Sequence, residues 1–238
     1  MAIKYNGYPE VRFHIDILDT VDDELITYWQ NQLGVYLQAG IAALELIGDL
    51  LLRHGELKKS DAGNQDFVTV LLIHWVFQRL RNSLNLLLAG YFPDTVATLR
   101  QAYEGVARQM MNLDSADFAA KWLKGKEPKL AASAISSFAK GLALAELYHP
   151  SQKAVSAQIG LESDMEVALA GSKDRAVGNI LFHNWLATLG IELFLLSNIY
   201  KELWLKVPAF ASRTKNLERL AQEHDKFVRD SFPGQVSL

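Results

Sequence analysis

The sequence predicts an all-α fold, a bundle of about six to seven helices with a short β-ribbon as its N-terminal arm. After Thr20, apolar residues recur with the period of three to four that is typical of helices. The six prolines all fall between these segments or in the N-terminal arm. Only residues 1–18 alternate with a period of two. Since no linker or internal repeat divides the chain, we expect residues 1–238 to form a single helical domain.

The N-terminal arm, residues 1–18, is expected to form a ribbon of two strands. Asn6-Gly7 is a hairpin signal, and the apolar residues that follow it at alternate positions are Val11, Phe13, Ile15 and Ile17. A single ribbon is not stable alone in water, so it needs a cover from the helical body or from a second copy. We therefore expect a homodimer with this arm at its interface.

In the first half of the chain, local signals indicate where each helix begins and ends. The first helix is expected over residues 20–53, because Thr20 and Asp23 resemble a capping box. Its glycines allow close packing or a bend; they are Gly34, Gly40 and Gly48. A second helix is expected over residues 66–89, after a polar loop. A third begins at Pro93, because proline is suited to a first helical turn.

In the second half, further helices follow the same rules. Asp114 or Ser115 caps a short fourth helix, and a fifth covers residues 130–147. A long apolar helix is expected over residues 174–205, with a proline to end it. The last helix covers residues 214–231. The stretch between the fifth and sixth helices has the least regular pattern.

The composition excludes several classes of protein. Half of the residues are hydrophobic and 21% are charged, which excludes a wholly disordered chain. There is no cysteine, so disulfides, thiolate metal sites and a cysteine nucleophile are excluded. The net charge of −3 lacks the basic signature of a nucleic-acid binder. No phosphate-binding glycine loop or zinc motif occurs, and Glu146 with His149 is the one Glu-x-x-His pair, where a di-iron bundle needs two. No metal and no cofactor are expected.

The sequence also predicts a cytoplasmic protein that does not enter a membrane. Residues 1–10 lack the pattern of a signal peptide. The longest uncharged stretch of the late apolar segment, residues 176–191, is interrupted by Asn179, His183 and Asn184. A membrane span needs about 20 predominantly apolar residues.

One stripe of the second helix is polar, and it has two interpretations. Its members are His74, Gln78, Arg81, Asn82 and Asn85. They either face water on an otherwise buried helix or line a cleft against the third helix. Amides and an arginine without carboxylates suit binding of a polar ligand better than catalysis.

Arg100 and Glu104 on the third helix are a further candidate. The pair is either structural or a guanidinium fork for a carboxylate or phosphate, which the glutamate holds in place. The short turn at residues 91–94 makes the two helices antiparallel neighbours, so Asn82 or Gln78 should reach the height of Arg100.

Three polar residues lie among apolar ones in the second half of the chain. His183 is expected as a hydrogen-bonded histidine of the core. Glu192 needs a partner if it is buried, and the sequence does not reveal which. His149 precedes a proline at a helix end, where it either caps the helix or points into a cleft.

Two motifs carry a resemblance to a known family. Gly90-Tyr91 followed by the segment from Leu99 to Glu104 resembles the core of a helical bacterial family of unknown function. The segments that begin at Trp122 and at Tyr148-His149-Pro150 are similar to that family's tryptophan step and Tyr/His-Pro-Ser turn. The resemblance covers about a third of the chain, residues 79–151. This family in turn looks distantly like HEPN helical bundles, some of which are metal-independent ribonucleases of phage defence and toxin–antitoxin systems.

The HEPN nuclease signature is Arg-x(4–6)-His, and Arg219 to His224 is the one match in this sequence. Leu220 stands where that signature usually has a polar residue. In an unbroken helix the two side chains would lie about 140° apart, with His224 on the apolar stripe. Arg100, Glu104 and His149 are therefore the better candidates for a site.

Together these observations predict a non-catalytic, HEPN-like, homodimeric module that binds a polar or anionic small ligand or a partner protein. Its expected binding residues are Gln78, Asn82, Arg100, Glu104, Tyr148 and His149. The alternative is a HEPN-like ribonuclease or toxin in which Arg100 binds phosphate and His149 is the acid/base. The low positive charge weighs against nucleic acid as a partner.

Overall fold

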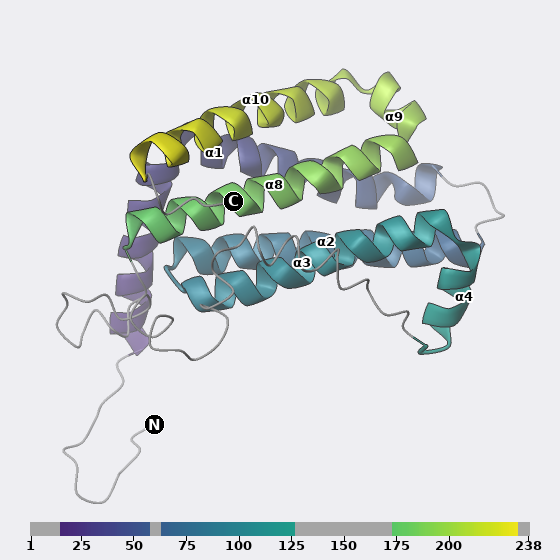
Figure 1. The fold of residues 1–238 in the computed structure, drawn as a ribbon, viewed down its shortest axis with the longest axis horizontal. Coiled ribbons are helices and arrows are strands. Elements are labelled where there is room, and N and C mark those ends of the chain that lie inside the picture. Colours follow the sequence, from purple (N-terminus) through teal and green to yellow (C-terminus); the bar gives the residue numbers. More distant parts are fainter. Residues whose placement is uncertain (1–14, 58–62, 127–172, 233–238) are drawn as a thin grey trace, which may run out of the picture.

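A computed structural model describes residues 15–57, 63–126 and 173–232 of the chain, and all regular structure within these ranges is helical (Figure 1). The all-α prediction is confirmed for this part of the chain. The helices are α1 (Ile15–Leu57), α2 (Asn64–Leu88), α3 (Phe92–Asp114), α4 (Ala116–Leu123), α8 (Arg175–Ile199), α9 (Lys201–Lys206) and α10 (Pro208–Ser231).

The predicted N-terminal ribbon is not supported where the structure describes it. Ile15 and Ile17 belong to the first turns of α1, which begins five residues before the expected cap at Thr20. Extending an existing helix gains one backbone hydrogen bond per residue, and an isolated ribbon has no such support. Residues 1–14, with Val11 and Phe13, lie outside the described residues.

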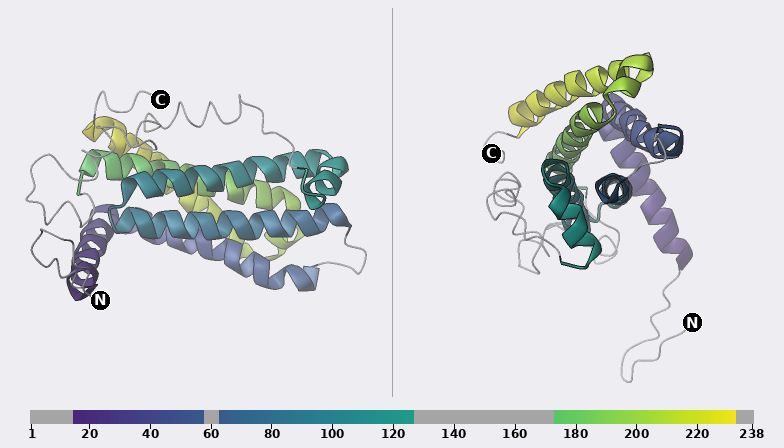
Figure 2. Two further views of the ribbon diagram at one scale, coloured as in Figure 1. Left: turned by 90° about the horizontal axis from the view of Figure 1, so that it is seen from below. Right: turned by 90° about the vertical axis from the view of Figure 1, so that its right-hand side faces the viewer.

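The long helices pack side by side around one core. α2 and α3 form an antiparallel pair, and α8 contacts α1, α2, α3 and α10, which makes it the central helix (Figure 2). α10 covers α1 and α8, while the short α4 packs on α2 and α3. The largest fully buried side chains are aromatic: Trp29, Phe92, Phe182 and Trp185.

Glycines shape α1, as the sequence predicts. Gly34 has φ 46° and ψ −122°, a conformation open to glycine and strained for other residues, and α1 bends sharply there (Figure 1). Gly40 lies against the indole of Trp185 on α8, and Gly178 of α8 lies against Trp29 of α1. In each of these two helices, therefore, a glycine makes room for a tryptophan of the other helix.

Two helix boundaries near the C-terminal end differ from the prediction. The expected helix over residues 174–205 is broken at Tyr200 into α8 and α9, and α10 begins at Pro208 instead of residue 214. The break lets Trp204 stack on Phe210, with ring centroids 5.2 Å apart. Asp174 begins α8 as predicted, because its carboxylate accepts from the backbone N–H groups of the first turn at 3.0 and 3.1 Å.

Candidate functional site

Glu104 on α3 holds two arginines. The Nε of Arg100 donates to Glu104 Oε1 at 3.1 Å, and Arg108 Nη1 lies 3.6 Å from Glu104 Oε2. These spacings place all three side chains on one strip of α3. The side chains are 40%, 22% and 21% exposed for Arg100, Glu104 and Arg108, so the strip is partly shielded from water.

Two contacts fix the register of α2 against α3. Gly105 lies against Trp75 and Val76, and Asn112 donates to Thr69 at 2.8 Å. In that register Arg100 is level with the stretch of α2 between Gln78 and Asn82.

The polar stripe of α2 faces outward. Four of its five members are exposed and Gln78 is half-buried, which agrees with a solvent-facing strip. Tyr148 and His149 lie outside the described residues, so a site shared with Arg100 and Glu104 stays a prediction.

Sequence reasoning did not find the partner of Glu192. This carboxyl group is fully buried in α8, and the side-chain amide of Gln109 on α3 donates to both of its oxygens at 3.0 Å. Burial raises the pKa of Glu192 to about 8, although the hydrogen bond from Gln109 acts in the opposite direction. The group is therefore mostly a neutral acid at neutral pH.

Further polar groups surround this end of the α2–α3 pair. Asn112 donates to the Gln65 carbonyl at 2.9 Å as well as to Thr69, and the Gln65 side chain donates to the Asn112 carbonyl. Burial, then the nearby Asp66 and Glu192, raise the pKa of the Tyr200 hydroxyl to about 12. These hydrogen bonds connect α2 with α3 and α3 with α8 and so help to fix the register of the three helices. Among the described residues, the buried side-chain oxygens of Gln109 and Asn112 have no hydrogen-bond partner.

A second buried cluster joins α8 to α10. His224 is fully buried, its ring packs on Tyr36 and Phe182, and its Nε2 lies 3.2 Å from Asn179 Oδ1. Because an amide oxygen can only accept, Nε2 carries the proton. The buried Nδ1 has no hydrogen-bond partner in the part of the chain that the structure describes. Burial lowers the pKa of His224 to about 4, with the nearby His183 acting in the same direction.

His183 is half-buried beside this cluster. Its Nε2 lies 3.5 Å from Asp225, which also pairs with Arg229 at 3.0 Å. Burial lowers the pKa of His183, and the charge of Asp225 partly offsets that shift. Among the described residues, no group of histidines and carboxylates is arranged to hold a metal ion.

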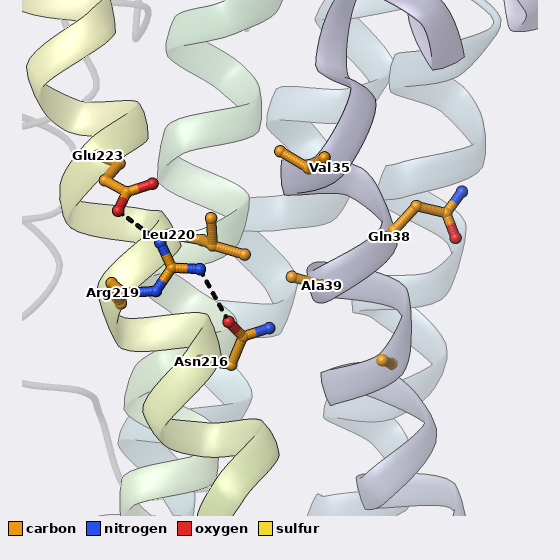
Figure 3. Close-up of a pocket in the computed structure, with 8 residues that line it drawn as sticks. Val35, Gln38, Ala39, Asn216, Arg219, Leu220 and Glu223 are labelled. Atoms are coloured by element: carbon orange, nitrogen blue, oxygen red, sulfur yellow. Dashed lines mark hydrogen bonds and ion pairs between the residues drawn. The ribbon is translucent and has the colours of Figure 1, made fainter.

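The one match to the HEPN nuclease signature is split between two faces of α10. Arg219 is exposed and binds Glu223 at 2.6 Å and Asn216 at 3.1 Å, whereas His224 lies in the core. Arg219 lines a groove of about 540 Å³ between α1 and α10 (Figure 3). The groove's other lining residues are Val35, Gln38, Ala39, Ala42, Asn216, Leu220 and Glu223. The guanidinium of Arg219 is bound to two of these lining residues, Asn216 and Glu223.

Two segments are long and apolar enough to cross a membrane by length and composition, Asp23–Arg53 and Arg175–Ile199. A core helix of a soluble protein meets the same criterion. Half of the second segment is buried inside the bundle, and α8 is the central helix. The absence of a membrane span stays a prediction.

Comparisons with protein-family models, with curated protein sequences and with solved structures found no match to this chain. The resemblance to a helical bacterial family therefore rests on the sequence motifs alone.

Proposed function

We propose that this chain is a non-catalytic, HEPN-like helical module that binds an anionic group, carried by a small ligand or by a partner protein. The observation that carries the proposal is the pairing of Arg100 and Arg108 with Glu104 on one strip of α3. A guanidinium group offers a planar fork that matches a carboxylate or a phosphate.

Glu104 prepares this strip for an anion in two ways. It holds the Arg100 guanidinium through Nε, so less conformational entropy is lost when a ligand binds. It also holds the Arg108 guanidinium on the same strip as that of Arg100. Partial shielding from water strengthens the attraction for an anion relative to a fully exposed arginine.

The alternative, a HEPN-like ribonuclease, receives no support from Arg219 and His224. A buried imidazole whose pKa is lowered to about 4 cannot reach a phosphodiester on the surface, and Arg219 faces away from it. A nuclease built on Arg100 and His149 remains a hypothesis to be tested.

The proposed module is a homodimer. Several large apolar side chains are exposed where α1 and α3 end, where α2 begins, and along α4 and α9, all at one end of the bundle (Figure 1). Leu52 and Leu205 are 84% and 77% exposed there. A second copy would remove this surface from water, which favours association.

Calorimetric titration of the full-length protein with inorganic phosphate and with succinate tests the binding function. Arg100→Lys should weaken binding at least about tenfold, because lysine lacks the fork. Its stability should change by only about 0.3–0.5 kcal/mol, the usual worth of a surface pair. Arg229→Lys is the matched control, since it also pairs with an acid four residues away. Equal binding by both variants would contradict the proposal.

An RNA-cleavage assay on the wild type and on His149→Ala separates the two functions. The proposal expects no cleavage by the folded wild type. Cleavage that the substitution abolishes would establish the nuclease instead.

A further inference from the structure

Arg79 on α2 is an arginine without an ion-pair partner in the part of the chain that the structure describes. Its guanidinium carbon lies 4.1 Å from the ring centroid of Trp75, one helical turn earlier. The residue is half-buried, and its Nε is buried with no hydrogen-bond partner among the described residues. A buried N–H donor that is left unsatisfied is costly, so this group calls for an acceptor.

The sequence explains why α2 supplies no acidic partner close to Arg79. Between Asp66 and Asp94 the chain contains no aspartate or glutamate. The residues four positions before and after Arg79 are Trp75 and Ser83. Other arginines of this protein have an aspartate or glutamate at one of these two positions. Those other arginines are Arg100, Arg108, Arg219 and Arg229.

The neighbouring helix does not neutralise Arg79 either. In the register of α2 and α3, Arg79 is level with Gln101, an uncharged residue. The nearest acid along α3 is Glu104, which is bound to Arg100 and Arg108. Among the residues that the structure describes, no carboxylate therefore balances the positive charge of Arg79 at the seam between these two helices.

Packing fixes the position of this charge. A Cβ atom on Gly105 would lie 3.1 Å from Trp75 Cδ1 and 2.6 Å from Val76 Cγ2, so the glycine lets the indole edge lie close to α3. The indole face then supports the guanidinium through a cation–π contact. A guanidinium held in this way loses little freedom when an anion binds to it.

We propose that Arg79, supported by Trp75, binds an oxyanion, a phosphate or carboxylate group, at the seam between α2 and α3. The guanidinium binds two oxygens of the anion through the N–H groups of its two terminal nitrogens. This site uses a different helix and a different arginine from the Arg100 strip, so it holds even if Arg100 binds nothing.

The experiment is an NMR titration of the full-length protein with inorganic phosphate and with acetate, at constant ionic strength maintained with chloride. The Nε–Hε resonance of Arg79 and the indole N–H resonance of Trp75 should shift and saturate together with the anion that the site prefers. Saturation by phosphate assigns a phosphate site, and saturation by acetate assigns a carboxylate site. The inference is overturned if neither anion produces saturation.

Variants separate this site from the rest of the surface. Arg79→Gln should weaken the affinity reported by the Trp75 resonance at least about tenfold, and Arg79→Lys should weaken it as well, because lysine lacks the fork. Arg81→Gln removes an exposed arginine from the same helix and should leave the affinity unchanged. Circular dichroism checks that each variant is folded.

Unchanged affinity in folded Arg79→Gln would overturn the inference. Loss of affinity in Arg100→Lys alone would support the proposed function and contradict this second site. Loss of anion affinity in the Arg79 variants alone would support this second site and contradict the proposed function of the Arg100 strip.

Discussion

At the scale of single residues, the same cause moves the pKa values of two buried groups in opposite directions. Glu192 and His224 both lie in the core with zero exposed surface. Removal from water disfavours the charged form of each, which raises the pKa of the acid and lowers that of the base. Each group therefore makes the stability of the fold depend on pH, in a different window.

The carboxyl of Glu192 should destabilise the fold as the pH rises. Its pKa is 4.5 when unfolded and about 8 in the fold, so the folded state holds more protons between these values. The contribution of Glu192 to the free energy of unfolding is fully present below pH 4.5 and is lost as the pH rises towards 8. Glu192→Gln keeps an acceptor for Gln109 and has no proton to lose, so its stability relative to wild type should grow by up to about 1.4 kcal/mol per pH unit.

Urea unfolding at pH 5, 6.5 and 8, followed by circular dichroism, measures this difference. Glu218→Gln, an exposed glutamate on α10, serves as the control and should show no such trend. A constant difference between Glu192→Gln and wild type across the three pH values would show that Glu192 is ionised in the fold.

His224 should destabilise the fold as the pH falls. Its pKa is 6.5 when unfolded and about 4 in the fold, so the unfolded state holds more protons in this window. With a neutral His224, the free energy of unfolding keeps its full value above pH 6.5, and it falls as the pH decreases towards 4. His224→Gln should flatten the loss of stability over this range, measured by urea unfolding at pH 4.5 and 7. An equally steep loss in the variant would assign the acid sensitivity to other groups.

At the scale of the elements, contacts between tryptophan and glycine set the distance between α1 and α8. A Cβ atom on Gly178 would lie 2.1 Å from Trp29 Cη2, and Trp29 is fully buried. Neither helix can carry a larger side chain at that contact unless the other helix moves.

Gly178→Ala should therefore destabilise the protein by about 1–3 kcal/mol, the usual cost of overpacking a core. Gly190→Ala on the same helix is the matched control, because no atom of the described residues lies within 4 Å of its Cβ position. There, alanine should stabilise the helix by up to about 1 kcal/mol. Free energies of unfolding in urea distinguish the two variants, and similar values for both would contradict the close contact.

At the scale of the whole molecule, one end of the bundle exposes apolar side chains that a second copy would cover. Light scattering at micromolar concentration should give the mass of a dimer. Leu52→Ser with Leu205→Ser should shift the mass towards that of a monomer, because both side chains are mostly exposed and their loss leaves the core intact. A monomeric wild type would refute the homodimer.

A deletion distinguishes the apolar end of the bundle from the N-terminal segment as the dimer interface. Removal of residues 1–14 takes away the segment that precedes α1. If that deletion alone gives a monomer, the N-terminal segment forms the interface instead of the apolar end of the bundle.

Much of the fold follows from local sequence signals. The apolar period, Asp174 as a cap and Pro93 in a first turn determine helices, because backbone hydrogen bonding and capping involve residues close together in the chain. The glycines of the first helix also indicated that it could bend, and it bends at Gly34. For the site, the spacing of Arg100 and Glu104 predicted their contact, since i,i+4 neighbours meet on any helix.

Tertiary structure decided which distant faces meet. Gln109 lies 83 residues before Glu192 in the chain, and nothing near either residue marks it as the partner. The break at Tyr200 accompanies the stacking of Trp204 on Phe210, and the surroundings of Arg79 depend on which residues of α3 lie opposite it. The sequence alone determined most of the helices and the polar stripe of α2. Packing determined partners, burial and pKa shifts, because these depend on distances between segments that are far apart in the chain.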